Sequence, residues 1–389
     1  MKRLAIITSH PIQYNAPLFK MLAVNGFICI KVFYTWGRGG IENKADPGFG
    51  KIIQWDIPLL EGYDHCFADN KSTNPGTHHF KGIINPNLIK EIEAWQPDAI
   101  LIFGWCFQSH LKCIRHFHDK IPVLFRGDST LLDETGGLKQ LMRRLFLKWV
   151  YRHIDIAFFA GENNRQYFIA HGLKEEQLIY APHAIDNDRF TEPADEYEKQ
   201  AAEIKRNAGI EADNLVLLFA GKLEQKKNPL FLVRLLNQIP DKRLKVLFVG
   251  SGAMLPELQS AAKADNRNRI IGFQNQQQMP AIYRAADLFI LPSAGPGETW
   301  GLAINEAMAC GKAVAASNKA GGAIDLIEDG VNGLILDINQ IDSLQKLIRS
   351  ALDNKTQLVG MGIQSKLKIQ AFSFRHIAAA IENCVVNQK

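Results

Sequence analysis

The sequence lacks the features that mark disulfide-bonded, secreted and membrane-spanning proteins. Its six cysteines include no C-x-x-C pair, and scattered cysteines of this kind are typical of reduced, small core residues in a cytosolic protein. No run approaches the roughly 20 apolar residues that cross a bilayer. The start, MKRLAIITSHP, has an apolar run of only four residues, which indicates a first strand rather than a signal peptide.

A strong charge of either sign is also absent. The net charge is +5, with 47% hydrophobic and 22% charged residues, which is the composition of an ordinary globular protein. The slightly basic balance permits contact with an anionic surface but is not a nucleic-acid-binding signature, so we expect no nucleic acid partner. A length of 389 residues exceeds one typical core and favours two domains.

Short apolar runs alternate with helix-like segments through both halves of the chain. Strands are expected at 4–8, 28–33, 99–103, 122–125, 154–160, 215–220, 245–249, 269–271, 288–291, 313–316 and 334–336. Helices are expected at 17–24, 87–95, 107–116, 229–238 and 279–285. This alternation predicts parallel sheets with helices on both faces. The charged stretch 191–208 lacks strand character, so we expect a domain boundary near its start.

The stretch from Gly295 to Glu328 contains two glutamates, Glu298 and Glu306, on either side of Gly301. A buried strand is expected just before it, and a helix after Gly301. A strand, a glycine-rich loop and a helix N-terminus suit an anionic ligand, because free backbone N–H groups and the positive helix end point at it. Glu306 could accept hydrogen bonds from the hydroxyls of a ribose, and Glu298 from a second polyol.

The run Glu298 to Gly311, ETWGLAINEAMACG, resembles the E-x7-E signature of the retaining GT-B glycosyltransferases, most closely glycosyltransferase family 4. The resemblance implies an α/β fold of two Rossmann-like domains facing across a cleft. Residues 1–190 would form the acceptor domain and residues 191–372 the nucleotide-sugar donor domain. Residues 373–389 would form a C-terminal helix that packs back on the N-terminal domain.

The resemblance implies transfer of a hexose-type sugar from a nucleotide diphosphate sugar to an acceptor hydroxyl, with retention and without a metal ion or other cofactor. Lys222 and Lys227 would hold the diphosphate, on which charge builds as the bond breaks. Lys222 stands where arginine is usual, so the bidentate fork is lost. Glu298 would bind the sugar hydroxyls, and Glu306 the ribose. Further donor contacts are expected from Thr299, Trp300, Gly301, Leu302, Gly221, Gly250, Gly272 and Phe273.

Several of these assignments have plainer alternatives. Gly250 and Gly272 could serve only as tight turns, without any contact to a nucleotide. The pair Gly321-Gly322 is interpreted as structural, a turn that needs close backbone approach.

The first half of the chain carries the residues expected on the acceptor side, where the resemblance is thinner. His10 and Gln13 lie in the loop after the first expected strand, where many family members have a glycine-rich loop. Asp128 follows another expected strand, at a place where members often carry a polar group near the reacting sugar. We therefore take Asp128 as a catalytic candidate, with a turn- or cap-forming role as its alternative.

Residues 139–152 contain five basic residues and no acidic one. On a helix of 100° per residue, apolar residues gather on one side and basic residues on the other: Met142, Leu145, Phe146, Trp149 and Val150 against Arg144, Lys148 and Arg152. A basic amphipathic helix can lie on an anionic membrane surface. The alternative is a core-packed helix with a solvated basic face.

The predicted protein is therefore a cytoplasmic glycosyltransferase, with peripheral contact with the inner face of the cytoplasmic membrane as an option. Its acceptor would be a glycan or a lipid-linked molecule in bacterial polysaccharide, lipopolysaccharide or glycolipid assembly. Two alternatives stay open at this stage. One is a non-catalytic nucleotide-sugar binder or membrane-associated assembly partner, and the other is a GT-B sugar-nucleotide epimerase.

Overall fold

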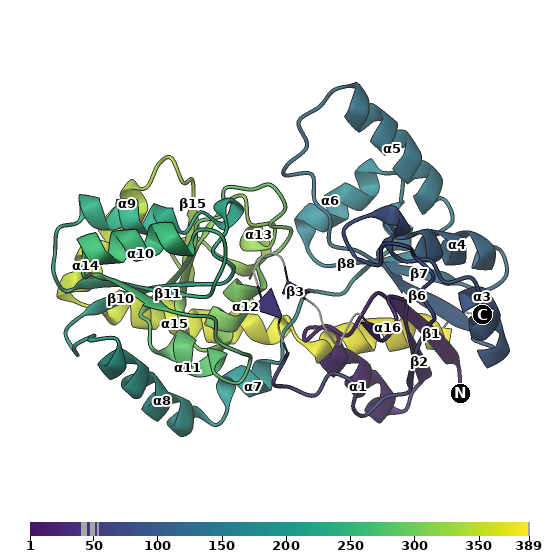
Figure 1. Ribbon diagram of the computed structural model, residues 1–389, viewed down its shortest axis with the longest axis horizontal. Coiled ribbons are helices and arrows are strands. Elements are labelled where there is room, and N and C mark those ends of the chain that lie inside the picture. Colours follow the sequence, from purple (N-terminus) through teal and green to yellow (C-terminus); the bar gives the residue numbers. More distant parts are fainter. Residues whose placement is uncertain (40–44, 47–50, 53, 388–389) are drawn as a thin grey trace. The chain divides into compact units, whose positions relative to one another are not determined.

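The computed structural model describes residues 1–39, 45–46, 51–52 and 54–387, which form two compact units (Figure 1). Unit 1 comprises Met1–Lys44, Pro58–His183 and Phe374–Lys389, and unit 2 comprises Ala45–Ile57 and Ala184–Ser373. The chain thus passes from one unit to the other between His183 and Ala184, and a short segment of the first half packs with unit 2. Residues 388–389 of the expected C-terminal helix lie outside the described residues.

Unit 1 is built on a parallel seven-stranded sheet in the order β5-β2-β1-β6-β7-β8-β9. Its strands are β1 (Arg3–Thr8), β2 (Cys29–Tyr34), β5 (His65–Phe67), β6 (Ala99–Phe103), β7 (Val123–Arg126), β8 (Ile156–Phe159) and β9 (Leu178–Tyr180). In register, Ile6 lies between Val32 and Leu101. The five strands expected in this half are confirmed, whereas β5 and β9, of three residues each, were not predicted.

Helices cover both faces of this sheet, as expected of parallel strands. They are α1 (Ala16–Asn25), α3 (Leu88–Trp95), α4 (Gln108–Phe117), α5 (Leu138–Tyr151), α6 (Glu162–Ala170) and α16 (Phe374–Asn387), with short 3₁₀ turns at Phe80–Gly82 and Glu175–Gln177. One core cluster joins α3, α4, α5 and α6 to the sheet.

The terminal helix α16 packs on unit 1, as the family resemblance implied. It lies beside α1 (Figure 1), and Asn25 Nδ2 donates to Glu382 Oε1 at 2.8 Å. Its buried face includes Ile377, Ala378 and Ile381. The amphipathic pattern at the end of the sequence therefore reflects burial in unit 1.

Unit 2 contains a parallel six-stranded sheet in the order β12-β11-β10-β13-β14-β15. Its strands are β10 (Leu215–Ala220), β11 (Leu244–Val249), β12 (Asn268–Ile271), β13 (Leu288–Leu291), β14 (Ala313–Ser317) and β15 (Gly333–Leu336). All six were expected from the apolar runs. A separate antiparallel pair, β3 (Ala45–Asp46) and β4 (Lys51–Ile52), belongs to the segment contributed by the first half.

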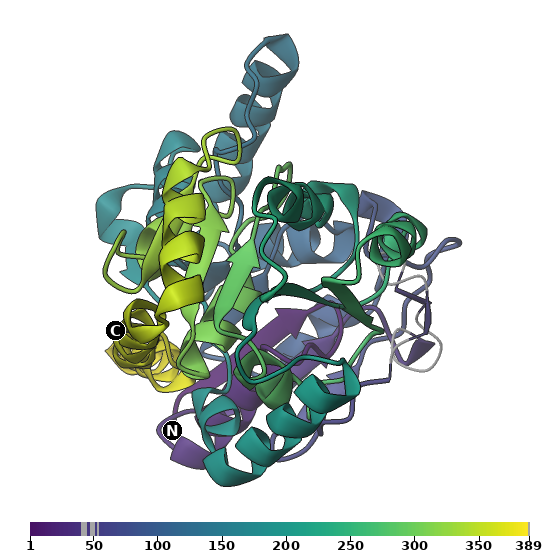
Figure 2. The same cartoon turned by 90° about the vertical axis from the view of Figure 1, so that its left-hand side faces the viewer.

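The helices of unit 2 surround its sheet (Figure 2). They are α7 (Asn187–Thr191), α8 (Ala194–Asn207), α9 (Leu230–Gln238), α10 (Leu255–Ala264), α11 (Met279–Arg284), α12 (Leu302–Ala309), α13 (Ala323–Leu326), α14 (Asp342–Asp353) and α15 (Thr356–Lys368), with 3₁₀ turns at Gln225–Lys227 and Ile369–Ala371. The charged stretch at the expected boundary is the helix α8, which buries only Ala201.

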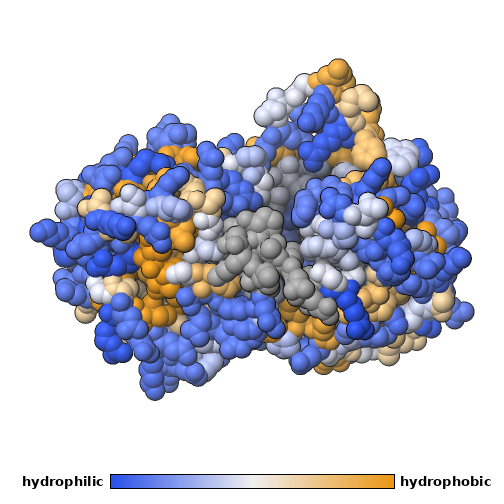
Figure 3. All heavy atoms as spheres, in the orientation of Figure 1, coloured by the Kyte–Doolittle hydropathy of each residue, from blue (hydrophilic) through white to orange (hydrophobic). Residues whose placement is uncertain are grey.

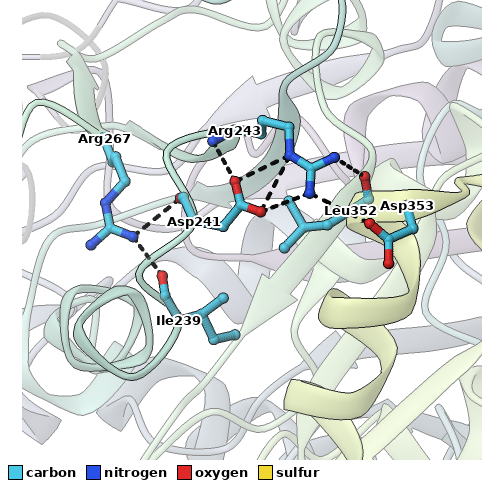
Figure 4. A network of polar contacts seen from close by, with 6 residues as sticks. All are labelled: Ile239, Asp241, Arg243, Arg267, Leu352 and Asp353. Carbon is cyan, nitrogen blue, oxygen red and sulfur yellow. Dashed lines mark hydrogen bonds and ion pairs between the residues drawn. The ribbon is translucent and has the colours of Figure 1, made fainter.

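Two arginines tie the amino ends of β11 and β12 to their neighbours (Figure 4). Arg243 Nη2 lies 2.7 Å from Asp241 Oδ2, and Arg243 Nη1 donates to the Leu352 carbonyl at 2.9 Å. Arg267 donates to the Ile239 carbonyl at 2.5 Å. The Arg243 guanidinium also lowers the pKa of the Asp241 carboxyl. This edge of the sheet is therefore fixed by charged side chains that bind backbone carbonyls.

The cysteines correct one expectation. Cys113, Cys310 and Cys384 are buried, but Cys29 and Cys106 are exposed, so only part of the set belongs to the core. Among the helices that the structure describes, none is both long and apolar enough to cross a membrane.

Candidate functional site

The candidate donor site lies on unit 2, where the loops after β10 and β13 meet. These strands are neighbours in the parallel sheet, so their carboxyl ends lie at one edge. Two hydrogen bonds fasten the loops together: Ala294 N donates to the Lys226 carbonyl at 2.8 Å, and Asn228 Nδ2 donates to the Pro292 carbonyl at 3.2 Å. Side chains from two distant stretches of sequence are thereby held side by side.

The centre of this site is an ion pair between Lys227 and Glu298. Lys227 Nζ donates to Glu298 Oε2 at 2.6 Å, and the Ser293 hydroxyl donates to the same oxygen at 3.3 Å. The side chains of Lys227 and Glu298 are 16% and 9% exposed, so both charges are largely removed from water. The structure thus brings together two residues that the sequence placed in separate motifs, and it adds Ser293, which sequence reasoning missed.

The two other lysines of the cluster lie in different surroundings. Lys226 Nζ lies 3.4 Å from Glu224 Oε1, so Lys226 forms a surface ion pair with Glu224. Lys222 is half-buried in the loop directly after β10. The spacing of Lys222 and Lys227 therefore puts both residues in the same loop at the carboxyl edge of the sheet.

Glu306 lies in α12 and is only 4% exposed. The fully buried Tyr283 of α11 donates its hydroxyl to Glu306 Oε2 at 2.6 Å. A carboxylate that is held in this way has a fixed orientation, because a charge-assisted hydrogen bond is short and strong. Tyr283 was missed by sequence reasoning, since a tyrosine in an apolar helix carries no signal of its partner.

The loop before α12 has the predicted form of strand, glycine-rich loop and helix. Gly301 precedes the helix with a φ of 95°, a region that favours glycine. Trp300 is 4% exposed, and its indole N–H donates to Asn305 Oδ1 at 2.8 Å. The Trp300 side chain is therefore part of the packing. Any contact from Trp300 with a ligand would therefore come from its backbone.

The glycine pair Gly321-Gly322 supports this loop from behind. Gly321 N donates to the Glu298 carbonyl, and Gly322 N donates to the Trp300 carbonyl, both at 2.9 Å. A Cβ on Gly322 would lie 2.7 Å from the Trp300 ring. The structural role expected for this pair is thus confirmed, and the pair also fixes the backbone of Glu298.

Close backbone packing explains Gly250 without a ligand. With a φ of 142°, a Cβ on Gly250 would lie 1.9 Å from the Gly221 carbonyl oxygen. Gly252 likewise approaches the Leu223 backbone, at 2.5 Å from a Cβ to the carbonyl oxygen. These glycines allow the loops after β10 and β11 to touch, which brings Gly221 and Lys222 close to the end of β11.

Gly272 and Phe273 follow β12, at the same edge of the sheet. A Cβ on Gly272 would meet nothing within 4 Å, so packing does not require glycine there. The Phe273 ring lies beside Trp55, with ring centroids 6.5 Å apart. Trp55 belongs to the segment that the first half contributes to unit 2, and no sequence signal pointed to this contact.

On unit 1, the acceptor-side candidates lie after β1. His10 Nδ1 is 2.9 Å from the Ser9 hydroxyl, and the His10 ring meets Trp36 edge-on with centroids 5.3 Å apart. Gln13 is half-buried in the same loop, before α1. Both residues therefore sit at the carboxyl edge of the unit 1 sheet, as the sequence predicted for the loop.

Asp128 is exposed in the loop after β7 and shares its surroundings with Arg126 and His183. Arg126 is buried and donates to the carbonyls of Ala181 and Pro182 at 2.8 and 3.1 Å. Although part of His183 reaches solvent, burial of its ring and the nearby Arg126 lower the pKa of His183 to about 4, against the opposite influence of Asp128. His183 thus stays neutral at neutral pH, and sequence reasoning missed it.

Comparison with known proteins supports the interpretation of unit 2. Residues 200–368 match the family model of glycosyl transferases group 1. D-inositol 3-phosphate glycosyltransferase from Corynebacterium aurimucosum is 29% identical over 65% of this chain and 61% of that protein. The GDP-mannose-dependent alpha-(1-6)-phosphatidylinositol monomannoside mannosyltransferase from Mycolicibacterium smegmatis is 26% identical over 61% of this chain and 63% of its own length. The chain therefore spans less than two thirds of these curated relatives.

Solved structures resemble the whole chain. Anabaena Alr3699/HepE, solved in complex with UDP and glucose, superposes with a TM-score of 0.72 at 20% identity, over 100% of both chains. WaaG, a glycosyltransferase involved in lipopolysaccharide biosynthesis, superposes with a TM-score of 0.67 at 14% identity, over 99% of this chain and 100% of its own. The two parallel sheets with their helices match these neighbours. The chain thus has the GT-B fold, and residues 200–368 match the model of the glycosyl transferases group 1 family.

Proposed function

We propose that the protein is a retaining, metal-independent glycosyltransferase that moves a sugar from a nucleotide diphosphate sugar to an acceptor hydroxyl. The observation that carries this proposal is the nearly buried pair of Lys227 and Glu298, 2.6 Å apart. A cation suited to a diphosphate and a carboxylate suited to sugar hydroxyls lie side by side, as the adjoining diphosphate and sugar of one donor molecule would require. The group 1 family match over residues 200–368 supports the same chemistry.

Each donor-side residue has a role that follows from its chemistry. Lys227 and Lys222 neutralise the charge that develops on the diphosphate as it leaves. Glu298 accepts hydrogen bonds from the sugar hydroxyls. Glu306, oriented by Tyr283, accepts hydrogen bonds from the ribose. The backbone of the loop before α12 adds N–H donors at the positive helix end.

In the proposed reaction the acceptor oxygen bonds to the anomeric carbon on the face from which the diphosphate departs. The bond between that carbon and the phosphate oxygen breaks, and the acceptor proton passes to the departing phosphate oxygen. This scheme conserves the anomeric configuration and uses no covalent enzyme intermediate. We assign the acceptor side to unit 1, with His10, Gln13 and Asp128 as its candidate contacts.

The names of two similar proteins support the proposed acceptor class. A phosphatidylinositol mannoside is the substrate named for one relative, and lipopolysaccharide biosynthesis is the process named for one structural neighbour. We infer that this protein acts in polysaccharide, lipopolysaccharide or glycolipid assembly in the bacterial cytoplasm, with a glycan or lipid-linked acceptor at the inner face of the membrane.

The test is release of nucleoside diphosphate from a panel of nucleotide sugars, with pooled glycan and lipid acceptors. Lys227→Gln should abolish release, whereas Lys226→Gln, the same change one residue earlier in a surface ion pair, should leave it intact. Glu306→Gln should raise the KM for the donor. Saturable donor binding without any turnover would refute the enzymatic proposal and favour a nucleotide-sugar-binding role.

A further inference from the structure

Helix α5 exposes a row of apolar side chains in its first two turns. Leu138 is 76% exposed, Leu141 54%, Met142 60% and Leu145 56%. The spacing i, i+3, i+4 and i+7 puts them on one side of the helix. We call this set the α5 apolar face. An exposed apolar row of this kind is a candidate contact surface, because contiguous apolar patches often mark protein–protein or membrane interaction sites.

The opposite side of α5 makes the contacts with the core of unit 1. Leu147, Val150 and Tyr151 are buried in unit 1, so the last turns anchor the helix to the body. The first turns extend away from the sheet of unit 1 in both ribbon views (Figures 1 and 2). Figure 3 shows apolar residues at this outer end. The alternative of a core-packed apolar side is therefore wrong for Met142 and Leu145.

Positive charges flank the α5 apolar face. At 100° per residue, Lys148 borders it on one side and Lys139 on the other, and Arg152 lies in line with it beyond its C-terminal end. All three residues are exposed, and α5 contains no acidic residue. Arg144 is different, because its Nη2 lies 3.0 Å from Glu134 Oε2. Its charge is compensated within the protein, so the basic stripe expected from the sequence loses this member.

We propose that α5 docks on the surface of an anionic lipid bilayer. The α5 apolar face enters the acyl boundary, and Lys139, Lys148 and Arg152 lie at the level of the phosphate groups. An exposed apolar row bordered by cations matches this partner, because a bilayer offers hydrocarbon and negative charge side by side. A second copy of the chain would need an acidic surface to meet the same cations. The inference specifies the membrane contact in the proposed function but does not depend on glycosyl transfer.

Cosedimentation with vesicles tests the charge part of the proposal. The protein should bind mixed phosphatidylglycerol–phosphatidylcholine vesicles and should not bind pure phosphatidylcholine. Each cation near an anionic surface contributes about fivefold in partitioning. The variant Lys139→Glu/Lys148→Glu/Arg152→Glu should therefore bind at least about a hundredfold more weakly. The control Lys90→Glu/Lys112→Glu/Lys263→Glu makes the same charge change at exposed lysines of other helices and should bind as the native protein does.

A second pair of variants tests the apolar part. Leu141→Gln/Met142→Gln/Leu145→Gln changes only exposed residues and should lose vesicle binding without a change in thermal midpoint. Helix α15 offers a matched control, since Val359, Ile363 and Leu367 are 60%, 57% and 64% exposed. Their replacement by glutamine should leave binding unchanged, although it removes a similar apolar row.

Three outcomes would overturn the proposal. The first is equal binding by the α5 variants and their controls, and the second is binding that does not require phosphatidylglycerol. The third is a native dimer in analytical ultracentrifugation that the α5 apolar variant converts to a monomer, which would make the face a contact between copies. A thermal shift with nucleoside diphosphate, retained in the α5 variants, would show that the donor site is intact. Loss of vesicle binding is thereby distinguished from failure of the proposed enzymatic function.

Discussion

The Lys227–Glu298 pair should couple the stability of unit 2 to its donor site. Lys227→Met leaves the Glu298 carboxylate, 9% exposed, with the Ser293 hydroxyl at 3.3 Å but without its cation. Breaking a buried ion pair by removing one partner costs about 3–5 kcal/mol. Because Lys227 is 16% exposed and water reaches part of the pair, we expect the lower end of that range. The variant Lys227→Met/Glu298→Gln removes the unpaired charge and should recover about 2 kcal/mol of the loss.

Differential scanning calorimetry without ligand measures this cycle. For a unit of this size, 1 kcal/mol corresponds to about 2–4 °C in the unfolding midpoint. Lys227→Met should therefore lower the unit 2 midpoint by roughly 6–12 °C, and the double variant should stand above it. Lys226→Met is the matched control. Its side chain is 39% exposed in the Glu224 pair, and such surface pairs contribute only about 0–1 kcal/mol.

The same samples connect stability to ligand binding. Nucleoside diphosphate should raise the midpoint of the native protein and of Lys226→Met by mass action, equivalent to about 2.7 kcal/mol at a hundredfold excess over Kd. It should not raise the midpoint of Lys227→Met. Strictly additive effects of Lys227→Met and Glu298→Gln would refute the energetic coupling. A full ligand shift in Lys227→Met would refute the assignment of Lys227 to the diphosphate.

Three other changes test neighbouring parts of the two units. Tyr283→Phe removes the hydroxyl that orients Glu306. It should weaken nucleotide binding about tenfold in calorimetric titration, since a hydrogen bond to a charged group contributes about 1.5–3 kcal/mol. Unchanged affinity would contradict the proposed contact between Glu306 and the ribose. Gly250→Ala places a Cβ 1.9 Å from the Gly221 carbonyl oxygen at a φ of 142°. It should destabilise unit 2 by about 3 kcal/mol or more in thermal unfolding. Full stability would show that the loops after β10 and β11 can move apart to admit the methyl group. Burial lowers the pKa of His110 to about 4 from 6.5, so the unfolded chain binds a proton first, and this residue should cost unit 1 up to about 3 kcal/mol between pH 6.5 and 4. The pKa of His183 is also lowered to about 4, so His110→Asn should reduce this pH dependence without removing it, and an unchanged slope would exclude His110 as one of its sources.

Local sequence signals were sufficient for the donor loop. The apolar strand β13, the proline after it and Gly301 all act within about ten residues, and together they predicted the strand, the loop and the start of α12. The two motifs each follow an expected strand, and the structure shows Lys227 and Glu298 at the same edge of the sheet. That these two side chains touch could not be predicted. Lys227 and Glu298 are 71 positions apart in the sequence, and they meet only because β10 and β13 are neighbours in the sheet.

The hydrogen-bond partners of buried polar groups could not be predicted from the sequence. Glu306 was recognised from its motif, but Tyr283 comes from another helix and has no motif of its own. For α5, periodicity showed an amphipathic helix but left the burial of its apolar side open. An apolar side on a helical wheel does not say whether a neighbour covers it. Unit 1 covers Leu147 and Tyr151 and leaves Leu141 exposed.

Ion pairs at the two edges of the unit 2 sheet have opposite consequences. At the amino edge, Arg243 meets Asp241 two residues away and also binds the Leu352 carbonyl. This arginine has several acceptors in the protein, so nothing from outside is needed to satisfy it. At the carboxyl edge, Lys227 is held to Glu298 by one nearly buried contact between the loops after β10 and β13. A compact ammonium of this kind can exchange one oxygen anion for another with little rearrangement. In the proposed function, an incoming diphosphate would bind Lys227 and the sugar hydroxyls would bind Glu298, so the ion pair would hold both side chains in place until the donor replaced it.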